Sequence, residues 1–180
     1  MSVALFIGRF QPFHNGHMQT VKRILHENEK LIIAIGSAQE NNTIKNPFTL
    51  DERKDFVYES LMDVGVKASQ LEIIPIEDIN DPPKWVDHLD SQLPKYDKVY
   101  TGSTLVKLCY NLKCPHKGQK GPEIISLKKI LPINATRIRQ LITANDSEWK
   151  TLVPKKVIEL LDEFKGIERI KIINSMSDNE

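Results

Sequence analysis

Short hydrophobic runs recur along the chain, and each is followed by a segment with helical spacing. The runs are VALFI at 3–7, LIIAI at 31–35, LEIIPI at 71–76, KVYTG at 98–102 and EIISL at 123–127. They lack the alternation of polar and apolar positions that marks half-exposed strands, so they predict strands covered on both faces. Strands separated by helices in this order predict a parallel sheet built from βαβ units.

The segments between the runs contain recognisable helix starts. Met18, Val21 and Ile24 share one face of the first expected helix. The other starts are marked by polar caps or proline: a capping box of Thr49 and Glu52, the pair Asp81–Pro82, and Ser103.

After residue 136 the pattern becomes entirely helical. An apolar stripe is formed by Val157, Leu160, Leu161 and Phe164, and Gly166 is the expected helix stop. The prediction is an α/β fold, a Rossmann-like parallel sheet with helices on both faces and a C-terminal helical cap. It forms one domain over 1–174, helical from about residue 136, followed by a flexible tail at 175–180.

Composition narrows the function classes. The 180 residues are 40% hydrophobic and 27% charged, and 25 basic against 24 acidic residues give a net charge of +1. This excludes a disordered chain and disfavours a nucleic-acid partner. No apolar run approaches the ~18 residues of a membrane helix, so no membrane partner is expected. Cys109 and Cys114 are expected to be free thiols, and with His116 they make only three zinc ligands, so no metal site is predicted.

The most informative stretch follows the first expected strand and reads GRFQPFHNGH at 8–17. In open parallel sheets, ligands bind at the carboxyl ends of strands. Gly8 allows close backbone approach, and Arg9 is a phosphate donor in the right place. If a helix begins near Asn15, His17 lies in its first turn, where free amides and the helix dipole attract anions and disfavour imidazolium. His14 and His17 are then neutral donors that stabilise charge on a phosphate.

A second phosphate element reads INATRIR at 133–139. Thr136 is expected to be the N-cap of a helix carrying Ile138 and Leu141. Arg139, three residues on, projects from the same face beside the open amides. Together Thr136 and Arg139 would hold the β- and γ-phosphates of a nucleoside triphosphate.

GRFQPFHNGH resembles the His-x-Gly-His signature of the nucleotidyltransferase superfamily, and its longer form is similar to that of archaeal-type nicotinamide-nucleotide adenylyltransferases. INATRIR resembles the superfamily's I-S-S-T-x-x-R. The likeness covers nearly the whole chain. It continues through IGSAQ at 35–39, NPFT at 46–49 with Glu52–Arg53, Trp85–Val86, Tyr100-x-Gly102, Trp149, Val153–Pro154 and GIERI at 166–170.

The resemblance implies an adenylyltransferase of NAD biosynthesis, which converts ATP and nicotinamide mononucleotide into NAD and pyrophosphate. A phosphate monoester is already a nucleophile, so direct in-line attack without a covalent enzyme intermediate is expected. Mg²⁺ would bridge phosphates and keep most of its waters. A cytoplasmic homo-oligomer is also implied, with a hexamer as its expected form.

The implied site has two sides. The catalytic residues are His14, His17 and Arg139. The ATP side adds Gly8, Arg9, Phe10, Gly102 and Thr136, and the mononucleotide side has Ser37, Lys45, Ile79, Asn80 and Trp85. The indole of Trp85 is suited to stack on a cationic nicotinamide ring, although core packing of a helix is its ordinary alternative.

Several interpretations stay open. Other acceptors are nicotinate mononucleotide, FMN and phosphopantetheine, and a nucleotide-sensing regulator would keep the pocket without turnover. Pro82 stands where relatives carry Asn, so recognition of the carboxamide is expected to shift to Asn80 or to backbone groups. Selectivity between nicotinamide and nicotinate is therefore undecided by the sequence.

Overall fold

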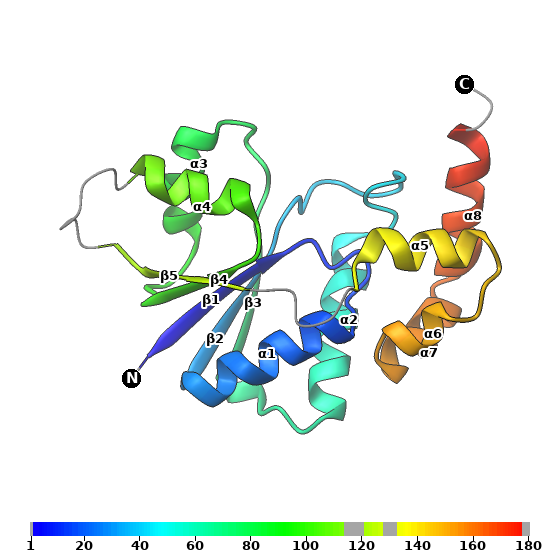
Figure 1. Ribbon diagram of the computed structural model, residues 1–180, viewed down its shortest axis with the longest axis horizontal. Helices are drawn as coiled ribbons and strands as arrows, with labels where there is room; N and C mark the ends of the chain where they lie inside the picture. Colours follow the sequence, from blue (N-terminus) through cyan, green and yellow to red (C-terminus); the bar gives the residue numbers. More distant parts are fainter. Residues whose placement is uncertain (1, 114–120, 128–132, 178–180) are drawn as a thin grey trace.

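A five-stranded parallel sheet forms the centre of the molecule. The computed structural model describes residues 2–113, 121–127 and 133–177. The strands are β1 (Val3–Gly8), β2 (Lys30–Ile35), β3 (Leu71–Pro75), β4 (Lys98–Thr101) and β5 (Glu123–Ser126), in the spatial order β3-β2-β1-β4-β5 (Figure 1). All neighbouring strands pair in parallel, so the predicted sheet is confirmed. The strand order reverses between β1 and β4, which is where ligands bind in such sheets.

Helices cover both faces of the sheet. They are α1 (Asn15–Glu27), α2 (Leu50–Asp63), α3 (Pro82–Gln92), α4 (Thr104–Lys113), α5 (Ala135–Thr143), α6 (Trp149–Leu152), α7 (Lys155–Glu163) and α8 (Gly166–Ser177), with a 3₁₀ turn at Ala68–Gln70. Figure 1 shows α3 and α4 on one side of the sheet, α1 and α2 on the other, and α5–α8 grouped as a separate cap. Within the described residues, no helix is long and apolar enough to cross a membrane.

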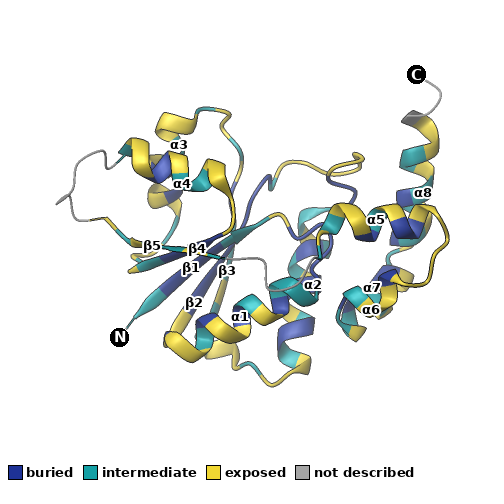
Figure 2. Cartoon of the chain, in the orientation of Figure 1, coloured by how far each residue is buried: buried dark blue, intermediate teal, exposed yellow. Residues whose placement is uncertain are grey.

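Alternating strand residues divide the core into two layers. Leu5, Ile32 and Val99 pack with α3 and α4, whereas Ala4 and Phe6 pack with α1, α2 and the C-terminal helices. Figure 2 shows this burial along the strands and on the inner faces of the helices. Because both faces of the central strands are covered, β1 and β2 are nearly continuous apolar runs rather than alternating ones.

An ion pair attaches the C-terminal cap to the sheet domain. The two terminal guanidinium nitrogens of Arg169 on α8, Nη1 and Nη2, donate to the carboxylate of Glu52 on α2, at 2.6 and 2.7 Å. Burial alone would raise the pKa of Glu52, but the bonds from Arg169 and from the Thr49 amide outweigh it and lower the pKa. Bidentate pairs of this kind fix geometry as well as add energy. The same Glu52 completes the predicted capping box with Thr49, which is confirmed.

The end of α7 differs from the prediction. Lys165, not Gly166, takes the left-handed conformation there, with a φ of 54°. Gly166 begins α8, and a Cβ on it would lie 2.8 Å from Leu161 Cδ2 and 2.9 Å from Phe48 Cε1. The glycine therefore serves close packing between α7, α8 and the segment before α2.

The end of the chain also differs in part from the expected tail. Helix α8 continues to Ser177, so residues 175–177 of that tail are helical. Residues 178–180 lie outside the described part of the chain.

Candidate active site

His14 and His17 form a stacked pair at the N-terminus of α1. His14 is the N-cap, and its Nδ1 accepts from the His17 amide at 3.3 Å. In return, His17 Nδ1 accepts from the His14 amide at 3.3 Å. The two rings lie with centroids 3.5 Å apart and planes inclined by 18°. The helix therefore starts at Asn15, as predicted, and its cap is made by the two histidines themselves.

This reciprocal capping fixes the protonation of both rings. A neutral imidazole whose Nδ1 accepts a hydrogen bond carries its proton on Nε2. Burial lowers the pKa of His14 from 6.5 to about 4. Burial, together with the charge of His14, lowers the pKa of His17 as well. Both side chains are thus neutral Nε2–H donors near neutral pH, as predicted from the helix dipole.

Two glycines make room for this arrangement. A Cβ on Gly16 would lie 3.1 Å from the ring of His14, and one on Gly8 would lie 2.8 Å from the ring of Phe10. Phe10 is fully buried, has a φ of 53°, and meets the His17 ring edge-on at a centroid distance of 4.9 Å. Its ring therefore packs against His17 within the core, and the place of Phe10 on the ATP side stays a prediction.

The second phosphate element lies beside the first. Arg139 on α5 donates from Nη1 to the carbonyl of Gln11 at 2.8 Å, although 128 residues separate them. The N-cap of α5 is Asn134, whose Oδ1 accepts from the Arg137 amide at 2.8 Å, so the expectation that Thr136 is the cap is wrong. Thr136 is the second residue of the helix, exposed, and its hydroxyl accepts from Arg139 Nη2 at 3.5 Å.

Three arginines create a positive potential at this edge of the sheet. Burial, and then the charge of Arg9, lowers the pKa of both Arg53 and Arg139. Neither Arg9 nor Arg139 pairs with a carboxylate among residues 2–113, 121–127 and 133–177. A bound polyanion would relieve the repulsion between them, and such a cluster of like charges is typical of a phosphate site.

Arg53 belongs to the NPFT-x-x-E-R motif, but the motif does not indicate what its side chain contacts. It is fully buried, and its guanidinium donates to backbone carbonyls in the loops after β1 and β2, including Gly36 at 2.9 Å and Ser37 at 3.1 Å. Arg53 shares the face of α2 that buries Phe56 and Val57. A charged residue in the apolar phase of a helix is the signal that could have identified it.

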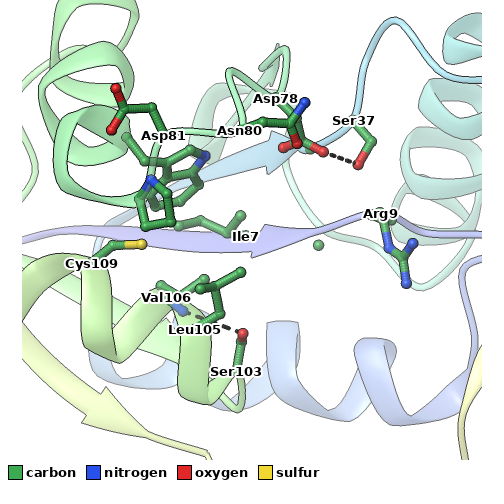
Figure 3. A pocket seen from close by; sticks show the side chains of 14 residues that line it. Ile7, Arg9, Ser37, Asp78, Asn80, Asp81, Ser103, Leu105, Val106 and Cys109 are labelled. Atoms are coloured by element: carbon green, nitrogen blue, oxygen red, sulfur yellow. Dashed lines mark hydrogen bonds between the residues drawn. The ribbon is translucent and has the colours of Figure 1, made fainter.

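A cavity of about 630 Å³ opens between α3 and α4, at the carboxyl ends of the strands. Five of the residues predicted for the site line it: Gly8, Arg9, Ser37, Asn80 and Trp85. Figure 3 shows Arg9, Ser37, Asp78, Asn80 and Asp81 around it. Asp78 and Asp81 also line it, and Asp81 stands at the N-terminus of α3, as its pairing with Pro82 predicts.

Trp85 fits both interpretations that its sequence position allows. It lines the cavity and is half-buried. It also packs against the core between the sheet and α3 and α4. Its role as a ring platform stays a prediction.

Other predicted residues lie outside the cavity lining. Ile79 is exposed, and Lys45 lines a different hollow, beside Ile173 and Met176 of α8. Gly102 is exposed just after β4, next to the lining residue Ser103.

The described residues include only one of the two cysteines that are expected to be free thiols. Cys109 is a buried, free thiol that lines the cavity, and burial raises its pKa. Cys114 and His116 lie outside the described residues.

The chain resembles known nucleotidyltransferases in both sequence and structure. A family model described as cytidylyltransferase-like matches residues 5–141. A bifunctional NMN adenylyltransferase/ADP ribose pyrophosphatase from Francisella tularensis superposes with a TM-score of 0.77 at 25% identity. That match covers 97% of this chain and 54% of the Francisella protein, so the chain corresponds to about half of it. The chain thus belongs to the cytidylyltransferase-like nucleotidyltransferases.

Curated relatives narrow the class to one family. The nicotinamide-nucleotide adenylyltransferase of Picrophilus torridus is 40% identical over 177 residues, which is 97% of this chain and 99% of that protein. The one from Thermococcus sibiricus is 37% identical over 172 residues, covering 94% of this chain and 88% of that protein. The chain belongs to the nicotinamide-nucleotide adenylyltransferase family. The predicted activity class, adenylyl transfer in NAD biosynthesis, is confirmed.

The lowered histidine pKa values predict acid sensitivity. Because the pKa of His14 is about 4 in the folded protein and 6.5 in its ordinary state, the unfolded chain binds more protons between these values. The histidine contribution to stability is therefore complete above about pH 6.5 and falls as the pH drops towards 4. His14 alone should remove roughly 2–4 kcal/mol of unfolding free energy across this range.

Urea unfolding at pH 7 and pH 4.5 measures this loss. The variant His14→Asn keeps a side chain that can cap α1 but does not titrate, so it should lose less stability between the two pH values. An equal loss in both proteins would contradict the buried, neutral state of His14.

Proposed function

We propose that the chain transfers AMP from ATP to nicotinamide mononucleotide, giving NAD and pyrophosphate. The observation that carries this proposal is the bond from Arg139 to the Gln11 carbonyl. It joins the two phosphate-binding segments into one site, next to a cavity large enough for a nucleotide. In this proposal, two neutral histidine donors and two arginines bind the triphosphate at the carboxyl edge of the sheet.

The proposed step is a direct displacement at the α-phosphorus of ATP. A phosphate oxygen of the mononucleotide forms a bond to this phosphorus while the bond to the bridging oxygen of pyrophosphate breaks. Negative charge grows on the α-phosphate oxygens and on the leaving group. His14 and His17 donate Nε2–H bonds to these oxygens, and Arg9 and Arg139 hold the triphosphate. No proton needs to leave either histidine, which agrees with their lowered pKa values.

The cavity is assigned to the mononucleotide. Ser37 is assigned to its ribose phosphate, and Asn80 and Trp85 are assigned to its ring. Asn80 has a φ of 51° and lines the cavity, as expected if it replaces the missing asparagine at Pro82. Gly102 and Thr136 remain on the ATP side of the proposal, and Lys45 and Ile79 are its least supported members.

Mg²⁺ is proposed to arrive with ATP. The side chains assigned to the triphosphate are two neutral imidazoles and two guanidinium groups. Such groups bind phosphate oxygens better than they bind a cation. Among the described residues, no three acidic, histidine or cysteine side chains gather as a metal site. Mg²⁺ bound to ATP would supply neutralisation of charge on the leaving pyrophosphate, and no side chain is assigned to hold it.

The proposal also includes an oligomeric state and a cellular compartment. A cytoplasmic homo-oligomer, with a hexamer as its expected form, is carried over from the family resemblance. Nicotinate mononucleotide, FMN and phosphopantetheine are the competing acceptors, and a sensor without turnover is the competing class.

An acceptor panel tests the function directly. With ATP and Mg²⁺, we expect pyrophosphate release and NAD formation from nicotinamide mononucleotide, and much less release with FMN or phosphopantetheine. Coupled pyrophosphate detection and chromatography of the dinucleotide measure both products. Binding of ATP and mononucleotide without any pyrophosphate would instead support the sensor.

His17→Ala should reduce kcat about 10²–10³-fold while ATP affinity changes little, because His17 is proposed to act on charge that develops in the transition state. His26→Ala is a matched control, since His26 is exposed in the last turn of the same helix. Steady-state kinetics on both variants give the comparison. A normal kcat with a raised KM would make His17 a binding residue only.

Trp85→Ala should raise the KM for nicotinamide mononucleotide roughly 10-fold and leave the KM for ATP nearly unchanged, since stacking on a cationic ring is lost. Val86→Ala is the control for packing, because Val86 is buried on the same helix and does not line the cavity. Melting temperatures and kinetics are measured on both. Loss of stability with normal acceptor kinetics in Trp85→Ala would refute the stacking role.

A further inference from the structure

Helix α8 contains an arginine that bonds to three separate parts of the molecule. The side chain of Arg169 is 25% exposed, and that of its partner Glu52 is 12% exposed. Besides this bidentate pair, Arg169 Nη1 donates to the carbonyl of Pro47 at 3.3 Å, and Nη2 donates to the carbonyl of Phe164 at 3.2 Å. The planar guanidinium therefore holds together α2, the segment before α2 and the end of α7.

The bond to Pro47 leads to the phosphate-binding loop. The amide of Phe48, the next residue, donates to the Gln11 side chain at 2.9 Å, and its carbonyl accepts from the same side chain at 3.1 Å. Gln11 is buried, and its own carbonyl is the acceptor for Arg139 Nη1. The acceptor that holds Arg139 is thus placed by the segment to which Arg169 bonds.

A second connection runs through the helices of the cap. Helix α8 packs against α5, which carries Arg139 (Figure 1). The two residues after the arginine of α8 both contribute to this contact. Ile170 is buried in the same core as Ile138 of α5, and Lys171 donates to the side chain of Asn145, just after α5, at 2.6 Å. These contacts join the two helices, so the position of α8 sets that of α5.

We propose that Arg169 is a positioning residue for Arg139, and thereby for the triphosphate of ATP. The inference rests on the proposed function. The Arg169 guanidinium lies where two paths meet. One path runs through the segment before α2 to Gln11, which accepts from Arg139, and the other runs through α8 and α5 to Arg139 itself. Both ends of the bond between Arg139 and Gln11 are therefore held from one side chain.

The geometry of this side chain matters more than its charge. The hydrogen bonds with Glu52 raise the pKa of Arg169, so the pair is charged at neutral pH. A lysine would keep the positive charge, but its ammonium group lacks the planar fork that bonds a carboxylate in bidentate fashion and reaches two carbonyls as well. Charge and geometry at position 169 can therefore be separated by substitution.

Arg169→Lys makes this separation. We expect the KM for ATP and the dissociation constant of ATP to rise about 10-fold, because a small misplacement of a binding group is costly. The KM for nicotinamide mononucleotide should change little, since Arg139 is assigned to the triphosphate. Arg23→Lys is the matched control, because Arg23 also pairs with a glutamate, Glu27, but does so on the exposed surface near the end of α1.

A double substitution distinguishes positioning from a general loss of stability. In an Arg139→Met background the bond to Gln11 is already absent, so the addition of Arg169→Lys should lower ATP affinity very little further. Melting temperatures of all variants measure stability separately. Normal ATP affinity in folded Arg169→Lys, or an equal fold-change in both backgrounds, would overturn the positioning role.

Glu52→Gln decides the question if Arg169→Lys does not fold. Glutamine can still complete the capping box of α2 but forms weaker bonds to Arg169, so ATP affinity should fall, by less than in Arg169→Lys. Unchanged affinity in Glu52→Gln would then contradict the inference. Titration calorimetry with ATP measures affinity without turnover. Failure of the proposed function is therefore distinguishable, because a protein that forms no NAD still reports the effect of each variant on ATP binding.

Discussion

The active site depends on one buried guanidinium. Among the described residues Arg53 has no carboxylate partner, and it instead donates to carbonyls of Arg9, Gly36, Ser37, Ala38, Glu40 and Thr49, at 2.9–3.4 Å. Burying a charge is costly unless it is compensated, and hydrogen bonds to a charged donor are stronger than neutral ones. The loops that follow β1 and β2 can satisfy Arg53 only in one arrangement, so the guanidinium fixes the backbone that lines the nucleotide site.

This constraint explains features that would otherwise be unfavourable. Ser37 has a φ of 50°, which a non-glycine residue rarely adopts, yet its carbonyl accepts from Arg53 and its hydroxyl donates to Asp78. Strained residues persist where the surroundings determine them, and they gather at functional sites. The charge of Arg53 also adds to the positive potential of Arg9 and Arg139 at this edge of the sheet.

The elements that the sequence predicts correctly are those set by local chemistry. The apolar runs are strands, α1 begins at Asn15, and the capping box of Thr49 and Glu52 is formed, because each depends on residues a few positions apart. The cap of α5 escapes prediction because Asn134 and Thr136 are both good caps, and only the loop before the helix decides between them. Gly166 escapes it because the reason for this glycine is contact with Phe48, which is far away in sequence.

The site is predictable as far as its motifs reach and no further. Spacing indicates the two phosphate segments, but not that Arg139 reaches Gln11 or that Arg53 turns inwards.

The C-terminal cap is tied at two points to the segment that carries the two histidines. Arg139 donates to Gln11, and Asn15 at the start of α1 donates to the carbonyl of Thr151 on α6 at 3.0 Å. The side chain of Gln11 in turn exchanges two bonds with the backbone of Phe48, at 2.9 and 3.1 Å. The loop with the histidines is thus held between the cap and the segment before α2. Since a helix N-terminus stabilises phosphate only when its donors are already aimed, this bracing is what the proposed role of His14 and His17 requires, because their rings need not reorganise as charge develops.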